Sequence, residues 1–207
     1  MSKKVFWCKN CLNMSTRPRI EFDNKCWCNA CQWSEEKKTF DWEGRKKELK
    51  KLLDKYRSNS GNFDCVVPVS GGKDGSYVAY TLKHKYGMNP LCITVAPALS
   101  LDLGDQNLKN FINSGYNHLH INPDVNIMQK LNKIGFVEKG FPYYGWLIAI
   151  QSAVIRTALN FNIPLLFYGE DGEVEYGGST ETKGNSLLSI DYQKKVWFEG
   201  GYDLVMS

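Results

Sequence analysis

Residues 63–86 read FDCVVPVSGGKDGSYVAYTLKHKY, and they determine the class of fold that this chain adopts. The first part, 63–69, is mostly apolar and β-branched, which predicts a short buried strand. The glycine-rich, polar residues 70–76 predict a tight loop, and 77–86 predict a helix that Gly87 ends. A buried strand, a glycine loop and a helix in this order form an arrangement that binds phosphate.

The glycine loop has the chemistry of a phosphate site. Glycines allow backbone N–H groups to close on an anion, and the N-terminus of the following helix adds positive potential. Lys73 can place a mobile charge on the phosphates, and Asp74 can hold the Mg²⁺ that a polyphosphate brings with it. The spacing excludes a Walker A loop and a dinucleotide G-x-G-x-x-G motif. An ordinary strand-to-helix turn is the alternative, although such a turn rarely needs Ser-Gly-Gly beside Lys-Asp.

The loop resembles the S-G-G-x-D-S signature of the ATP pyrophosphatases, or PP-loop enzymes. That superfamily includes GMP synthetase, NAD synthetase, argininosuccinate synthetase and the tRNA thiolation enzymes. They share one step, in which ATP adenylates an oxygen, pyrophosphate leaves and a nucleophile displaces AMP. The resemblance leaves open which hydroxyl serves the loop, because glycine stands where many members have serine and a serine comes next. It implies that ATP binds Ser70, Gly71, Gly72, Lys73, Asp74, Gly75 and Ser76.

The rest of the chain predicts an α/β fold. Apolar and amphipathic patterns predict further strands at 91–97, 118–121 and 164–169, and helices at 103–112 and 146–159. Alternating strands and helices indicate a parallel sheet, whose ligands bind beyond the carboxyl ends of the strands. An adenine is accordingly expected on backbone groups at the end of the second strand, at Thr94 and Val95. The resemblance implies that this is an adenine nucleotide alpha hydrolase-like (PP-loop) domain.

A run of carboxylates follows the last predicted strand. Glu170, Asp171, Glu173 and Glu175 lie within six residues, and like charges so close to one another repel. Mg²⁺ with pyrophosphate would supply the compensating positive charge. A solvated acidic loop is the alternative.

Four of the seven cysteines form two C-x2-C pairs, Cys8 with Cys11 and Cys28 with Cys31. This pattern is typical of a four-thiolate zinc site, because each tight turn aims two sulfurs at one ion. Cys26 competes with Cys28, but a single intervening residue makes a poor turn between two ligands. An iron–sulfur cluster also takes four cysteines, and disulfides are disfavoured in a reducing compartment. A closed four-thiolate site leaves no position for a substrate, so we predict a structural Zn²⁺.

Charge is uneven along the chain. The first 60 residues carry 15 Lys/Arg and 8 Asp/Glu, a net charge of +7, whereas the remainder carries −3. The basic residues gather in 37–57, a segment that could meet nucleic acid, an acidic partner or a phosphorylated ligand. Leu49, Leu52 and Leu53 favour a solvated helix with these leucines turned inward. Nucleic acid is not an expected partner, because binders of this kind usually add exposed aromatics or a reader module.

Composition and length limit the classes of protein to which this chain can belong. The chain has 207 residues, of which 43% are apolar and 13% aromatic, and this excludes a disordered protein. No apolar run is long enough to span a membrane and the first residues lack a signal peptide, so we expect a cytoplasmic protein without a membrane partner. A polar break at 58–62 sets the predicted domains: a four-cysteine zinc-binding segment at 1–40, a basic helical linker at 41–60 and a PP-loop domain at 61–207.

Over nearly its whole length the chain resembles the N-acetyl sugar amidotransferases of surface-polysaccharide and flagellin-glycan biosynthesis. The matching features are the cysteine pairs, the phosphate loop, and the stretches 85–91 (KYGMNPL), 135–146 (GFVEKGFPYYGW) and 168–178 (YGEDGEVEYGG). Members of this family are usually longer, so part of their C-terminal region is expected to be missing here.

This resemblance implies that the acetamido group of a sugar becomes an acetamidino group. ATP adenylates the amide oxygen, ammonia attacks the imidate carbon and AMP leaves. Lys73, Asp74 and Asp171 are the implied catalytic residues, the two aspartates as Mg²⁺ ligands, and Gly169 and Glu170 are implied at the nucleotide. The residues implied at the sugar are Tyr143, Tyr144, Trp146, Glu175 and Tyr176, with core packing as the alternative for Trp146.

Ammonia needs a source, and the sequence predicts no glutaminase. Ser2 stands where an N-terminal cysteine nucleophile would be, and Cys65 and Cys92 lie inside predicted strands. The resemblance implies a separate glutaminase subunit and an ammonia-channelling, cyclase-like subunit as partners. Two other functions stay open: a tRNA thiolation enzyme, with Cys65 and Cys92 as candidate catalytic cysteines, and a non-catalytic nucleotide-binding module.

Overall fold

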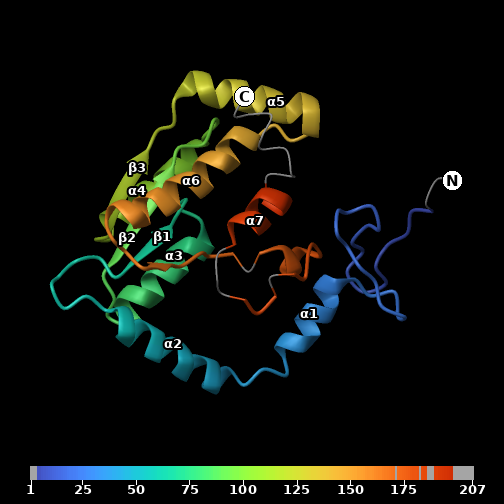
Figure 1. Ribbon diagram of the computed structural model, residues 1–207, viewed down its shortest axis with the longest axis horizontal. Coiled ribbons are helices and arrows are strands. Elements are labelled where there is room, and N and C mark those ends of the chain that lie inside the picture. The colour runs from blue at the N-terminus through green and yellow to red at the C-terminus, as the bar shows by residue number, and fades with distance from the viewer. Residues whose placement is uncertain (1–3, 171, 182, 186–188, 198–207) are drawn as a thin grey trace. The chain divides into compact units, whose positions relative to one another are not determined.

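The computed structural model describes residues 4–197, apart from 171, 182 and 186–188. Its elements, most of them labelled in Figure 1, follow one another as α1 (Asn29–Lys37), α2 (Trp42–Tyr56), β1 (Cys65–Pro68), α3 (Lys73–Tyr80), η1 (Thr81–Lys85), β2 (Pro90–Val95), α4 (Asp102–Asn113), β3 (Asn117–Ile121), α5 (Val125–Lys139), α6 (Tyr144–Asn160), β4 (Leu165–Leu166), η2 (Glu173–Tyr176), α7 (Ile190–Tyr192) and η3 (Gln193–Trp197).

The chain divides into two compact units. One contains Met1–Glu48 and Glu170–Leu188, and the other contains Leu49–Gly169 and the segment from Ser189 onward. The first unit carries the cysteine pairs and the acidic run, and the second carries the phosphate loop. The boundaries expected from the sequence, after residues 40 and 60, stay predictions.

The second unit is built on a four-stranded sheet with the order β3-β2-β1-β4 (Figure 1). Every neighbouring pair is parallel, with Cys65 opposite Pro90 and Cys65 opposite Leu165 in the two pairs that β1 forms. The predicted α/β class with a parallel sheet is therefore confirmed. The last strand, β4, comprises only Leu165–Leu166 and is shorter than predicted, although the Phe167 N–H also donates to the Val66 carbonyl at 3.0 Å.

Each face of the sheet has its own core. Cys65 and Val67 point to the face that buries Leu82 and Phe111, from η1 and α4. Val66 points to the opposite face, where it packs with residues of α6 and β2. Successive side chains of a strand point to opposite faces, so the apolar run in β1 fills both cores.

Helix α3 begins four residues earlier than the sequence predicted. Its first residue is Lys73, with the extended Gly72 as its N-cap. At Thr81 the α-helix changes into the π-helical turn η1, which continues to Lys85. The glycine loop is therefore shorter than predicted, and Lys73 and Asp74 lie in the first turn of the helix.

Helix α5, which the sequence analysis did not predict, has clear ends. The Asp124 side chain accepts hydrogen bonds from the backbone of Asn126 at 2.9 Å and of Ile127 at 3.0 Å. Gly140, with φ of 67°, ends the helix in the left-handed conformation. Exposed apolar residues such as Phe136 and Val137 blur its periodicity, which explains why the pattern was missed.

The basic helix predicted before the phosphate loop is α2, but one of its leucines is placed differently. Leu53 is fully buried and Leu49 packs partly against the same core, as predicted. Leu52 is 40% exposed, so the prediction that it turns inward is wrong. Leu52 lies about 100° around the helix from Leu53, at the opposite edge of the apolar stripe, where it remains partly exposed.

The long apolar helix predicted at 146–159 is α6, which packs against the sheet. Val154 is 1% exposed and Ala158 is 6% exposed, and both contact the core formed by β1 and β2. Among the residues that the structure describes, no helix is long and apolar enough to cross a membrane.

Close packing between α5 and α6 should make any side chain at position 135 destabilising. An added Cβ would lie 2.1 Å from the Tyr144 Cβ and 2.6 Å from the Phe141 carbonyl oxygen. We expect Gly135→Ala to lower the free energy of unfolding by about 2–3 kcal/mol, measured by urea denaturation. Gly104→Ala is the matched control, because nothing lies within 4 Å of that added Cβ in α4. The control should be neutral or stabilising by up to about 1 kcal/mol, and equal effects of the two substitutions would contradict the observed packing.

Candidate functional site

The phosphate loop is formed by backbone segments that approach one another too closely for side chains. Gly71 has φ of 80°, and a Cβ there would lie 2.6 Å from the backbone nitrogen of Leu108. A Cβ at Gly75 would lie 2.7 Å from the Pro68 carbonyl oxygen. Serine therefore has no room at position 75, and among the two adjacent candidates Ser76 is the one that can offer a hydroxyl.

Gly169 belongs to the same group of close contacts. A Cβ at this residue would lie 2.7 Å from the Gly75 nitrogen and 3.1 Å from the Asp74 Cβ. The structure therefore brings Gly169, at the end of the chain segment that follows β4, against the first turn of α3. The resemblance implied a nucleotide contact at Gly169, and that assignment stays a prediction.

Lys73 and Asp74 form an exposed ion pair at the start of α3. The Lys73 Nζ lies 2.6 Å from the Asp74 Oδ1, and their side chains are 88% and 48% exposed. Exposed pairs of this kind stabilise a fold by less than about 1 kcal/mol, so stability does not require them here. Ser70 is also exposed, and its Oγ accepts a hydrogen bond from the Gly72 backbone at 3.4 Å.

Thr94 and Val95 end β2 beside the loop, but their polar groups have partners inside the protein. The Thr94 hydroxyl donates to the Val69 carbonyl at 2.6 Å. The Val95 carbonyl accepts a hydrogen bond from the Trp146 indole at 3.2 Å. An adenine at this strand end would meet the side chain of Val95 rather than a free hydroxyl of Thr94.

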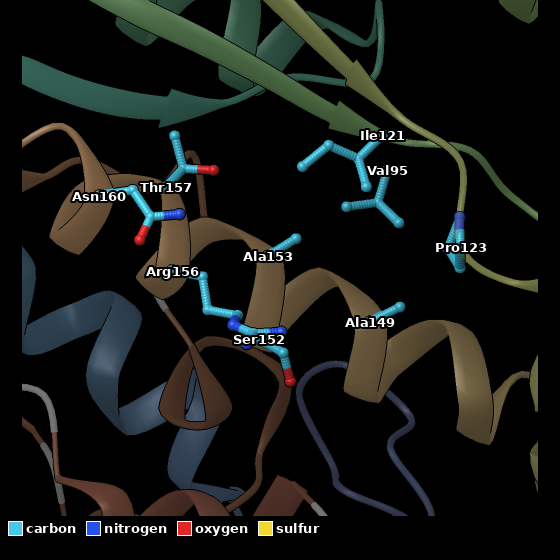
Figure 2. Close-up of a pocket in the computed structure, with 9 residues that line it drawn as sticks. All are labelled: Val95, Ile121, Pro123, Ala149, Ser152, Ala153, Arg156, Thr157 and Asn160. Carbon is cyan, nitrogen blue, oxygen red and sulfur yellow. The ribbon is translucent and has the colours of Figure 1, made fainter.

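A cavity of about 410 Å³ opens beside Val95, between the ends of β2 and β3 and helix α6. Figure 2 shows Val95 and Ile121 pointing from the strands toward α6, where Ala149 and Ala153 face them. Small side chains on α6 leave this space, and Arg156 lies at the same part of the helix. The cavity offers mainly apolar surface to a ligand.

The three aromatic residues predicted to stack on a sugar lie in different environments. Tyr143 is 43% exposed, and its ring lies 6.4 Å from that of Trp146. Trp146 is half-buried and bound to the Val95 carbonyl, so its position fits the alternative of core packing. Tyr144 is fully buried against α5, which places it in the interior rather than on a surface that a sugar could reach.

In the first unit, protein side chains compensate the acidic run. Arg19 contacts the Glu173 carboxylate at 3.2 Å, and Lys37 lies 3.9 Å from the Glu175 carboxylate. The Tyr176 hydroxyl donates to Glu170 at 3.1 Å. Asp171, predicted to bind Mg²⁺, lies outside the described residues. Arg19 and Lys37 were not expected in this role, because no local pattern connects them with residues 170–178.

The four predicted zinc ligands form one cluster. The sulfurs of Cys8, Cys11, Cys28 and Cys31 all lie within 4.8 Å of one another. Measured Sγ–Sγ distances are 3.8 Å for Cys8 with Cys31, 3.5 Å for Cys11 with Cys28 and 3.7 Å for Cys28 with Cys31. A tetrahedron with metal–sulfur bonds of about 2.3 Å has edges of about 3.8 Å, so the cluster fits Zn²⁺.

Backbone donors around the cluster favour bound thiolates. The backbone N–H groups of Asn10 and Cys28 point at the Cys8 sulfur, at 3.4 and 3.2 Å. Burial raises the pKa of Cys8, but backbone donors outweigh it and lower that pKa to about 6. Burial raises the pKa of Cys31 to about 12, so a cation is needed to keep this sulfur ionised.

Comparisons with known proteins give partial similarities. No family model matches the chain. An uncharacterized protein of Methanocaldococcus jannaschii is 33% identical over 89 residues, which are 42% of this chain and 32% of that relative. The matched part of the chain thus spans about a third of the relative's length.

Among solved structures, a predicted subunit of tRNA methyltransferase from Methanocaldococcus jannaschii has a TM-score of 0.39 and 21% identity, over 61% of this chain and 58% of that chain. NMN synthetase from Francisella tularensis has a TM-score of 0.43 and 18% identity, over 61% and 53%. NH3-dependent NAD synthetase from Campylobacter jejuni has a TM-score of 0.43 and 16% identity, over 61% and 56%. At such low TM-scores nothing about the reaction of this chain follows from the similarity.

The choice between Cys26 and Cys28 as a metal ligand can be tested by metal content. Cys26 has φ of 59° and lies outside the cluster, whereas Cys28 is fully buried within it. We expect Cys26→Ser to keep one zinc per chain and Cys28→Ser to lose it, measured by mass spectrometry of the metal after purification. Cys28→Ser should also have its unfolding midpoint at a lower urea concentration, because the expected metal cross-links the segment. Loss of zinc from the Cys26 variant would contradict the ligand set.

Proposed function

We propose that this chain is an ATP-dependent amidotransferase that converts the acetamido group of an N-acetyl sugar into an acetamidino group. Surface polysaccharide or flagellin glycan biosynthesis would use such a product. The observation that carries the proposal is the phosphate loop, in which Gly71, Gly75 and Gly169 pack backbone against backbone around the first turn of α3. The matching stretches at 135–146 and 168–178 support the sugar as the substrate class.

ATP solves a specific chemical difficulty in this reaction, because an amide carbonyl is a poor electrophile. Attack of the amide oxygen on the α-phosphorus forms a P–O bond, breaks the bond to the β-phosphate and expels pyrophosphate. Ammonia then adds to the imidate carbon, the C–O bond breaks and AMP leaves. Two protons are released to solvent in forming the neutral amidine, which takes one back to become cationic.

The chain's own groups have defined roles in this proposal. Backbone N–H groups at Gly71 and Gly72 and the N-terminus of α3 bind the phosphates, and Lys73 offsets the charge that builds on them. Asp74 would hold Mg²⁺, because a carboxylate oxygen is a ligand that this ion prefers. When bound, Mg²⁺ neutralises charge on the pyrophosphate leaving group. Asp171 stays a proposed second ligand.

The cysteine cluster and the residues proposed at the sugar and the nucleotide have the following roles. Zn²⁺ in the four-cysteine cluster is structural, since four thiolates close its coordination. Tyr143 in the second unit, and Glu175 and Tyr176 in the first, are exposed and stay proposed contacts of the sugar. Thr94, Val95, Gly169 and Glu170 stay proposed contacts of the nucleotide, through backbone or apolar atoms where their polar groups are engaged.

Ammonia would come from partners. Cys65 and Cys92 are fully buried, and burial raises the pKa of both thiols to about 12. Neither can act as a glutaminase nucleophile or as the accessible thiolate that tRNA thiolation requires. We therefore propose a separate glutaminase subunit and an ammonia-channelling, cyclase-like subunit, and we do not propose tRNA thiolation or a nucleic-acid partner.

Pyrophosphate release tests the proposed reaction. The assay combines the chain with ATP, Mg²⁺, ammonium and an N-acetyl sugar nucleotide. Lys73→Ala should lower the rate by about 100-fold, because the charge opposite the leaving phosphates is lost. Lys85→Ala is the matched control, an exposed lysine of η1 that binds Tyr77, and it should keep the rate. ATP binding without pyrophosphate release in the unaltered chain would instead favour a non-catalytic nucleotide-binding module.

Replacing the two buried cysteines of β1 and β2 tests whether the chain carries out amidation or thiolation. The double variant Cys65→Ala, Cys92→Ala should keep the rate of pyrophosphate release, because both side chains only pack in the sheet. Its folding should be checked by urea denaturation before activity is compared. Loss of activity in a folded double variant would contradict the amidotransferase proposal and support thiolation.

A further inference from the structure

Two hydrogen bonds fix the point at which the chain leaves the sheet to form the phosphate loop. Val69 is the residue before Ser70, and it is 5% exposed. Its N–H donates to the Ile93 carbonyl at 2.9 Å, and its carbonyl accepts from the Thr94 hydroxyl at 2.6 Å. Both polar groups of Val69 are therefore bound to β2, and the second bond comes from a side chain.

His118, on the neighbouring strand β3, continues this chain of hydrogen bonds. Its Nε2 lies 2.8 Å from the Thr94 Oγ1. A threonine hydroxyl has one proton, and the short contact with Val69 uses it. The hydroxyl must then accept from His118, so Nε2 carries the proton in this tautomer.

The surroundings keep this arrangement neutral. Thr94 is 6% exposed, so its hydroxyl depends on these two partners rather than on water. Burial, and then nearby His120, lowers the pKa of His118. A neutral imidazole has one N–H to donate, and the contact with Thr94 determines which nitrogen holds it.

We propose that Thr94 and His118 are positioning residues that hold the start of the phosphate loop in the geometry that accepts a triphosphate. This inference rests on the proposed function, in which the loop binds ATP. Beyond Val69 the loop lies against the backbone of α4 at Gly71, where an added Cβ would be 2.6 Å from the Leu108 nitrogen. A loop held at both Val69 and Gly71 loses less conformational entropy when its N–H groups bind an anion.

The test removes and restores each donor in turn. Thr94→Val deletes the hydroxyl at nearly constant shape, and Thr94→Ser keeps it. His118→Leu deletes the donor, and His118→Gln supplies an amide N–H of similar reach. His120→Leu is the matched control, an exposed histidine two residues along the same strand. The measurements are the dissociation constant of α,β-methylene ATP, and KM for ATP and kcat for pyrophosphate release.

We expect Thr94→Val and His118→Leu to raise the dissociation constant and KM for ATP about tenfold, with a smaller change in kcat. Thr94→Ser and His118→Gln should restore both, and His120→Leu should match the unaltered chain. A merely structural role would lower the urea midpoint of unfolding and leave the affinity of the folded protein unchanged. If folded Thr94→Val binds α,β-methylene ATP as tightly as the unaltered chain, this inference is wrong and the proposed function is unaffected. Absence of ATP binding in the unaltered chain overturns the proposed function, and this inference with it.

Discussion

Close packing of backbone around the first turn of α3 is the constraint on which the rest of the structure depends. Gly71 lies against the backbone of Leu108, Gly75 against the carbonyl of Pro68, and Gly169 against the nitrogen of Gly75. These contacts join the end of β1, helix α4 and the segment after β4 at the carboxyl edge of one sheet. A side chain has no room at these three glycines, and a loop of this kind allows backbone N–H groups to approach an anion.

Sequence patterns predicted the parts of the fold that local periodicity controls. The apolar runs around Cys65 and Cys92 became β1 and β2, since strands buried on both faces are apolar throughout. Helix α5 was missed because exposed apolar residues such as Phe136 hide its buried face. Tyr144 was implied at the sugar, but it is fully buried against helix α5. Burial by a distant segment leaves no trace in the local pattern.

The difference between local patterns and contacts with distant segments also explains how much of the site was predicted. Cysteine spacing predicted the four members of the cluster, because a C-x2-C turn is a local structure, and the structure gathers those four sulfurs while leaving Cys26 outside. The partners of the acidic run could not be predicted, since Arg19 lies far from Glu173 in the sequence and meets it through folding. The role of the Thr94 hydroxyl could not be predicted either, because its partner Val69 lies on another strand.

The metal cluster and the acidic run belong to one small folding unit. One buried cluster of this unit consists of Cys8, Cys28 and Cys31 with a few partly buried neighbours, and Trp33 and Val174 are buried in the same unit. Asn29, next to a ligand and 5% exposed, donates to the Gly178 carbonyl at 2.5 Å. A core this small buries little apolar surface, so a metal bound by the four sulfurs would add stability that the unit otherwise lacks. Asn29 connects the cysteine turn to Gly178, so such a cross-link would also help to order the segment that ends there.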